Sequence, residues 1–111
     1  MQHICAIVPP VTAREICDAL RRFGRPGVTV SQVASADARG HAEVYRGSRV
    51  TAGLGSRTRV DIVASDADSR DLVELIRSVA SRSRLGGTTI WTDRVVQLAR
   101  IRTGERGLDA L

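Results

Sequence analysis

A strand, a helix and a second strand follow one another in residues 58–92, which read TRVDIVASDADSRDLVELIRSVASRSRLGGTTIWT. Residues 58–63 alternate polar and apolar side chains, as is typical of a strand with one buried face. Ser65 and the aspartates beside it are candidate helix caps, and the glycine pair at 86–87 is expected to end the helix. Residues 88–92 then predict the next strand. The apolar stripe of the helix follows i, i+3, i+4, i+7 and consists of Leu72, Leu75, Ile76 and Val79.

The first half of the chain repeats this order. Residues 4–8, ICAIV, form an apolar run that two prolines stop, which predicts a buried strand. Thr12 and Glu15 have the spacing of a capping box at the start of a helix. That helix is expected to end before Gly24, and residues 28–33 predict a further strand. Its apolar stripe consists of Ile16, Ala19, Leu20 and Phe23.

Two consecutive β-α-β units predict an α+β domain of the ferredoxin-like type that spans residues 1–111. Its antiparallel four-stranded sheet would carry both helices on one face. The chain is too short to cover the other face by itself, so we expect association of several copies. Residues 95–98, VVQL, are expected to form a short extra strand that serves this interface.

The segment between the two units, residues 34–57, has no sustained hydrophobic period and contains four glycines. A connection of this length inside a small domain is usually functional or disordered. We interpret it as an exposed functional loop.

The charge of the chain favours an anionic partner. The formal net charge is +5, and all seventeen basic residues are arginines. Phosphates, nucleic acid or an acidic protein surface would suit this balance. Platforms for single-stranded nucleic acid usually need several aromatic rings, whereas this chain has only Phe23, Tyr45 and Trp91. A phosphate ligand is therefore preferred, and no nucleic-acid partner is expected.

Other chemical motifs are not apparent. Cys5 and Cys17 form no metal or redox motif, and neither His3 nor His41 has a partner at ligand spacing, so no metal site is expected. There is no nucleophile elbow, and we do not expect an enzyme. The apolar run near the N-terminus is too short for a leader peptide, and no run approaches the about 20 residues of a membrane span. We therefore expect a cytoplasmic protein without a membrane span.

Residues 100–111, RIRTGERGLDAL, resemble the C-terminus of the PII signal-transduction family, the nitrogen regulatory P-II proteins. PGVTV at 26–30 is similar to the second strand of that family, and GHAEVYRGS at 40–48 is similar to its long exposed T-loop. The resemblance extends over the whole chain. It also includes Ile7, Pro10, Ala19, Leu20 and Gly24.

The resemblance implies a homotrimer that binds ATP or ADP between neighbouring subunits. The T-loop, about residues 35–57, would contact a target protein such as a transporter or a metabolic enzyme. The C-terminal loop, about residues 100–111, would supply two arginines that grip the phosphates, since guanidinium groups suit phosphate oxygens. By resemblance, the nucleotide-binding residues are Ile7, Thr29, Asp37, Ala38, Val63, Gly86, Gly87, Thr88, Thr89, Arg100 and Arg102.

Two further groups follow from the same resemblance. Arg57 occupies the position of a lysine that meets the carboxylate of 2-oxoglutarate in many members. The T-loop residues expected to contact the target are Arg39, Tyr45, Arg46, Ser48 and Arg49.

The chain also departs from the family pattern. Residues 86–89, GGTT, replace a Gly-Asp-Gly sequence followed by lysine or arginine, and Ala38 replaces a glutamine that helps to place magnesium and 2-oxoglutarate. Val50 replaces the tyrosine that many members modify. These changes favour a divergent sensor of ATP or ADP that does not respond to 2-oxoglutarate. The alternatives are a conventional nitrogen sensor, a sensor of AMP or bicarbonate, an arginine-rich nucleic-acid-binding module and an enzyme that hydrolyses nucleotide.

Overall fold

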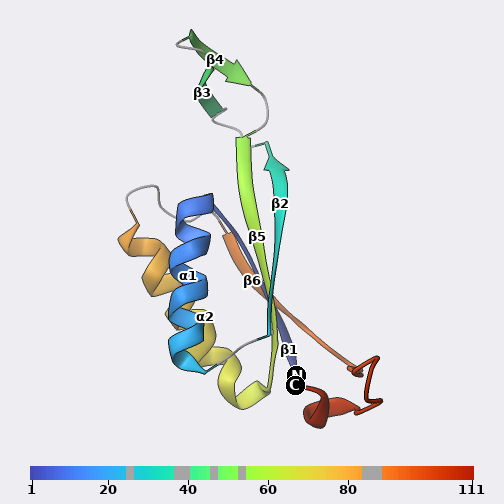
Figure 1. Ribbon diagram of the computed structural model, residues 1–111. Coiled ribbons are helices and arrows are strands. Elements are labelled where there is room, and N and C mark those ends of the chain that lie inside the picture. Colours follow the sequence, from blue (N-terminus) through green and yellow to red (C-terminus); the bar gives the residue numbers. More distant parts are fainter. Residues whose placement is uncertain (25–26, 37–40, 46–47, 53–54, 84–88) are drawn as a thin grey trace.

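The computed structural model describes residues 1–24, 27–36, 41–45, 48–52, 55–83 and 89–111 (Figure 1). Both predicted β-α-β units are present, together with a hairpin between them and a short tail. In chain order the elements are β1 Gln2–Val8, α1 Pro10–Phe23, β2 Val28–Ser35, β3 His41–Tyr45, β4 Ser48–Ala52, β5 Gly55–Ala64, α2 Asp66–Arg82, β6 Thr89–Arg94 and the 3-10 helix η1 Gly107–Ala110.

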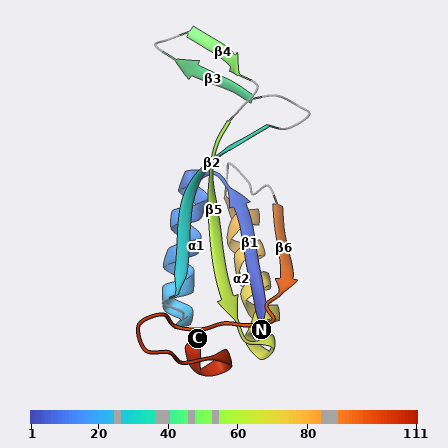
Figure 2. The same ribbon diagram turned by 90° about the vertical axis from the view of Figure 1, so that its right-hand side faces the viewer.

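The main sheet has four antiparallel strands in the order β2-β5-β1-β6. Figure 2 shows both helices behind this sheet and no element in front of it. The ferredoxin-like α+β fold predicted from the sequence is therefore confirmed. One face of the sheet packs on the helices and the other is open, as is common for antiparallel sheets.

The core lies between the sheet and the two helices. From Arg57 to Ala64 on β5 the residues at even positions are buried and those at odd positions are half-buried, which is the alternation expected of a strand with one face in the core. The predicted helix stripes also lie in this core, except that Phe23 is exposed at the end of α1. The largest fully buried side chains include Ile4, Ile16, Leu20, Leu72 and Ile76.

The start of α1 differs from the prediction. The helix begins at Pro10 rather than after Thr12, because proline is well suited to the first turn, where its missing N–H is not needed. Thr12 is buried inside the helix, and its Oγ1 donates a hydrogen bond to Ser83 Oγ at 2.9 Å. The predicted capping box of Thr12 and Glu15 is therefore wrong, and the threonine joins α1 to the end of α2 instead.

The start of α2 agrees with the prediction, but its end does not. Ser65 Oγ accepts a hydrogen bond from the backbone N–H of Asp68 at 3.2 Å, which makes Ser65 the N-cap. The helix ends at Arg82, before the glycine pair that was expected to end it. Gly86 and Gly87 lie outside the described residues.

The segment between the units is more regular than its sequence suggested. β2 continues to Ser35, β5 already begins at Gly55, and β3 and β4 pair as an antiparallel hairpin between them. Figure 1 shows this hairpin beyond the end of the sheet. Backbone pairing between β3 and β4 forms this hairpin despite the absence of a sustained hydrophobic period.

Residues 95–98 do not form the expected strand. The backbone N–H of Val95 still donates to the carbonyl of Met1 at 3.1 Å, but this residue already lies outside β1, which begins at Gln2. The chain instead forms a tail, in which Ala99 and Arg106 make an isolated antiparallel bridge. Within a single chain the prediction is therefore wrong, because the segment runs past the end of its neighbouring strand.

None of the helices in the described part of the chain has the length and apolar character needed to cross a membrane.

Candidate ligand site on the open sheet face

The face of the sheet that points away from the helices, called the open face below, carries four of the predicted nucleotide-binding residues, Ile7, Thr29, Val63 and Thr89. Strand pairing aligns Thr29, Asp61, Cys5 and Trp91 in one row across the four strands. Trp91, at the end of this row, is 40% exposed. The open face consists of His3, Cys5, Ile7, Thr29, Ser31, Arg59, Asp61, Val63, Thr89, Trp91 and Asp93.

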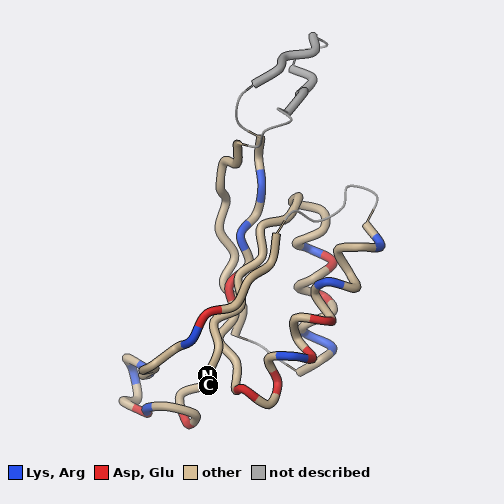
Figure 3. The backbone as a smooth tube through the Cα atoms, turned by 180° about the vertical axis from the view of Figure 1, so that it is seen from behind, with Lys and Arg blue, Asp and Glu red and all other residues tan. Residues whose placement is uncertain are grey.

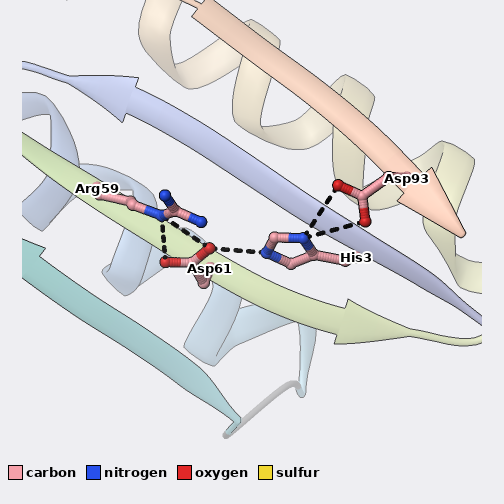
Figure 4. Close-up of polar contacts among 4 residues, drawn as sticks. All are labelled: His3, Arg59, Asp61 and Asp93. Carbon is pink, nitrogen blue, oxygen red and sulfur yellow. Dashed lines mark hydrogen bonds and ion pairs between the residues drawn. The ribbon is translucent and has the colours of Figure 1, made fainter. Parts of the chain in front are cut away.

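Four charged or titratable side chains form a network on this face (Figure 4). Arg59 Nε donates to both carboxylate oxygens of Asp61, at 3.0 and 3.1 Å. His3 Nε2 lies 2.7 Å from Asp61 Oδ1, and His3 Nδ1 lies 3.2 Å from Asp93 Oδ1. A ring that carries both protons donates to the two carboxylates at once. The network links β5, β1 and β6.

The network controls the charge of Asp61. Burial alone would raise the pKa of this carboxyl, but the hydrogen bonds from Arg59 and His3 favour the charged form and hold the pKa below its usual range. Asp61 is therefore an anion at neutral pH.

Cys5 lies between Asp61 and Trp91 in the register and is fully buried although it is on the open face. Burial, followed by the negative charge of Asp61, raises the pKa of the Cys5 thiol. The cysteine is therefore a protonated thiol at neutral pH.

The predicted nucleotide-binding residues that lie on the sheet are divided between its two halves, β1 with β6 and β5 with β2. Ile7 on β1 pairs with Thr89 on β6, which follows residues 86–88 in the sequence. Thr29 lies on β2, the other edge strand, and Val63 lies near the end of β5. Thr29 and Thr89 are therefore three strand spacings apart, or about 14 Å, before any offset along the strands is added. A single chain does not bring the two groups together.

The tail places the two predicted phosphate arginines in different environments. Arg100 Nε donates to the carbonyl of Ala110 at 3.0 Å, and Nη2 donates to that of Leu111 at 3.0 Å. Arg100 Nε also lies 3.4 Å from Glu105 Oε2. The guanidinium of Arg100 therefore holds Glu105, Ala110 and Leu111 together within the tail. Arg102 is exposed and has no hydrogen bond or ion pair with any residue that the structure describes.

The tail and its arginines lie on the open-face side of the molecule. In Figure 2 the tail leaves β6 and crosses below the sheet toward the β2 side, and Figure 3 shows the charged residues along it. Residues 99–103 line a hollow of about 600 Å³. Arg102 is exposed in this hollow and is therefore available to an anion.

The remaining predicted residues are only partly described. Arg57 lies half-buried on β5, where its Nη1 donates to the carbonyl of Ser56 at 2.8 Å. Tyr45, Ser48 and Arg49 belong to β3 and β4, but their side chains are not described. Asp37, Ala38, Arg39, Arg46, Gly86, Gly87 and Thr88 lie outside the described residues.

Sequence reasoning missed the His3, Arg59, Asp61 and Asp93 network. The alternation along β1 and β5 puts His3, Arg59 and Asp61 on one face of their strands, and this signal is visible in the sequence. The strand register is not visible there, and it is the register that brings His3 next to Asp61 and Asp93, which are 58 and 90 positions away.

The fold defines the chain as a ferredoxin-like α+β domain with a long hairpin between its β-α-β units. The family model described as nitrogen regulatory protein P-II matches residues 1–105. The chain is 35% identical to the nitrogen regulatory protein P-II of Rhizobium meliloti (strain 1021) and 33% identical to that of Rhodospirillum rubrum, with full coverage of both chains in each case. The chain therefore belongs to the nitrogen regulatory protein P-II family of signal-transduction proteins.

A solved structure agrees with this assignment. The crystal structure of Arabidopsis thaliana PII bound to citrate matches with a TM-score of 0.75 and 26% sequence identity. The match covers 99% of this chain and 91% of the plant protein.

Proposed function

We propose that the chain is a regulator that binds ATP or ADP between neighbouring copies and signals to a target protein through the loop of residues 35–57. The observation that supports this proposal is the division of the predicted nucleotide-binding residues between the β2–β5 half and the β1–β6 half of one sheet. Such a site is complete only when the β2 edge of one copy meets the β6 edge of another.

A ring of copies satisfies this requirement. An interface between two different surfaces of the same chain repeats head to tail, and it closes when the rotation fits a whole number of copies. A homotrimer closes in this way, with the open faces turned toward the axis. The trimer would also cover Trp91 and the rest of the open face, because in a single chain the two helices pack on the opposite face of the sheet.

The two edges would contact different parts of the nucleotide. Thr29 and Val63 on one copy offer a hydroxyl and backbone groups for the adenine, and Arg102 offers an exposed guanidinium for the phosphates. Ile7 and Thr89 of the next copy would complete the pocket beside residues 86–88. Because the nucleotide would also lie near the base of the loop, ATP and ADP can favour different loop conformations if their contacts differ.

Calorimetric titration of the purified protein with ATP, ADP and AMP tests the ligand class. We expect saturable binding of ATP or ADP at micromolar to millimolar concentration, and no tighter ATP binding when 2-oxoglutarate and Mg²⁺ are added, because Ala38 has no group to coordinate the ion. Enhancement by 2-oxoglutarate would instead indicate a conventional nitrogen sensor. Absence of binding by all three nucleotides would refute nucleotide sensing.

Association through the open face predicts a large effect of Trp91→Glu. Trp91 is exposed in the single chain, but association would bury the carboxylate of the new glutamate in the interface without a partner, which is costly. We expect the variant to be smaller than the wild type by size-exclusion chromatography with light scattering. Val11→Glu makes the same kind of change on the helix side, where Val11 is 56% exposed, and should not alter the mass. If the two variants behave alike, the open face is not the interface.

A further inference from the structure

Three potential metal ligands from two strands meet on the open face. One ring nitrogen of His3, the Sγ of Cys5 and a carboxylate oxygen of Asp61 all lie within 4.8 Å of one another. His3 and Cys5 are two residues apart on β1 and therefore share a face, and Asp61 is the direct strand partner of Cys5 on β5. We propose that these three residues bind one thiophilic divalent metal ion, with Zn²⁺ as the best match.

The ligand types support this assignment. One imidazole nitrogen, one thiolate and one carboxylate form a mixed set that Zn²⁺ accepts, whereas Mg²⁺ and Ca²⁺ prefer oxygen ligands alone. At zinc bond lengths of about 2.0 Å to nitrogen and oxygen, a tetrahedral ion separates the two atoms by about 3.3 Å. His3 Nε2 and Asp61 Oδ1 are now 2.7 Å apart, so a small movement of the two side chains would admit the ion.

The neighbouring residues are those expected around a metal site. Asp93 lies 3.2 Å from His3 Nδ1, and this contact orients the ring so that Nε2 points toward Asp61 (Figure 4). Metal-bound histidines usually have such a carboxylate on their second nitrogen. Arg59 holds the carboxylate of Asp61 in place from the other side.

The charges also balance. A thiolate, a carboxylate and a neutral imidazole together carry two negative charges, which a divalent ion cancels. The positive charge of Arg59 and the negative charge of Asp93 cancel each other. The site would thus be neutral on a partly buried face, where an uncompensated charge would be unfavourable.

In the single chain the fourth position of the ion would be open to solvent, because the side chains of His3 and Asp61 are 22% and 21% exposed. In the ring proposed above, this position would face the neighbouring copies. This proposal is independent of nucleotide binding, because its three residues are not among those assigned to the nucleotide.

Cobalt titration of the full-length protein, with absorption spectroscopy, tests the site. Co²⁺ replaces Zn²⁺ in such sites, and a bound thiolate gives a charge-transfer band alongside the strong visible bands of a tetrahedral ion. We expect one Co²⁺ per chain, displaced by Zn²⁺. In Cys5→Ser the charge-transfer band should disappear, and in His3→Asn the affinity should fall at least tenfold.

Two further variants make the test specific. Cys17→Ser removes the other free cysteine, which lies on α1, and should leave the spectrum unchanged. Asp93→Asn keeps all three ligands but should lower the affinity about tenfold to 100-fold through the loss of ring orientation. Circular dichroism would confirm that each variant is folded, and Cys5→Ala would replace Cys5→Ser if the latter is not.

The proposal would be overturned by any of three results. These are no tetrahedral cobalt spectrum at millimolar Co²⁺, the same charge-transfer band in Cys5→Ser or Cys5→Ala as in the wild type, and loss of the band in Cys17→Ser.

Discussion

Arg102→Ala should weaken ATP binding about tenfold to 100-fold, because a hydrogen bond to a charged group contributes about 1.5–3 kcal/mol. Arg102 is the predicted phosphate residue whose guanidinium has no partner among the described residues, so its removal should disturb the tail little. Calorimetry with ATP measures the loss of affinity directly. The fold of the variant can be checked by its unfolding transition in urea.

Arg106→Ala is the matched control for this variant. Arg106 is also exposed and lies on the same tail, so its replacement removes the same charge from the same segment. We expect less than a threefold effect on ATP binding, a difference of well under 1 kcal/mol. Equal losses in the two variants would show that the tail attracts nucleotide only through its general positive charge, and Arg102 would then have no specific role.

Leu72→Ala should lower the free energy of unfolding by about 2–5 kcal/mol, the range found when a fully buried leucine leaves a cavity. Leu72 is 0% exposed and belongs to the core cluster between the two helices and the sheet. Urea unfolding at fixed protein concentration measures the change, since association would make stability depend on concentration.

Leu75→Ala is the control for the core. Leu75 lies on the same helix but is only partly buried, so the same substitution should cost clearly less. A loss below 1 kcal/mol for Leu72→Ala, or a larger loss for Leu75→Ala, would contradict the assignment of the core.

The order of the β-α-β units could be predicted because periodicity depends on local sequence. The stripe around Leu72 and the alternation along β5 are both visible in the chain, and both match the burial observed. Thr12 shows the limit of such reasoning. Its spacing to Glu15 suits a capping box, but the preceding prolines start the helix earlier and Ser83, far along the chain, takes the hydroxyl.

Strand register accounts for most of what the sequence could not show. His3 seemed to lack metal-ligand partners because Asp61 is 58 residues away, and only the pairing of β1 with β5 brings them together. Arg100 looked equivalent to Arg102 by resemblance, yet the folded tail uses Arg100 to hold the carbonyls of Ala110 and Leu111. Whether Arg100 also contacts phosphate remains a prediction.

The central claim is that each nucleotide site takes one edge from each of two copies, and a mixing experiment tests it most directly. Arg102→Ala damages the group that one copy would supply together with Thr29 and Val63. Thr89→Glu places a negative charge in the group that the next copy would supply together with Ile7. Each variant alone should bind ATP poorly. When the two are refolded together in equal amounts, random assembly should give about a quarter of the sites with both groups intact.

ATP binding capacity of this mixture, measured by equilibrium dialysis, is the decisive quantity, with native mass spectrometry to confirm that mixed assemblies form. The shared site predicts that about a quarter of the wild-type capacity returns, at an affinity close to that of the wild type. If mixed assemblies form and no capacity returns, each site lies within a single chain and the account is wrong.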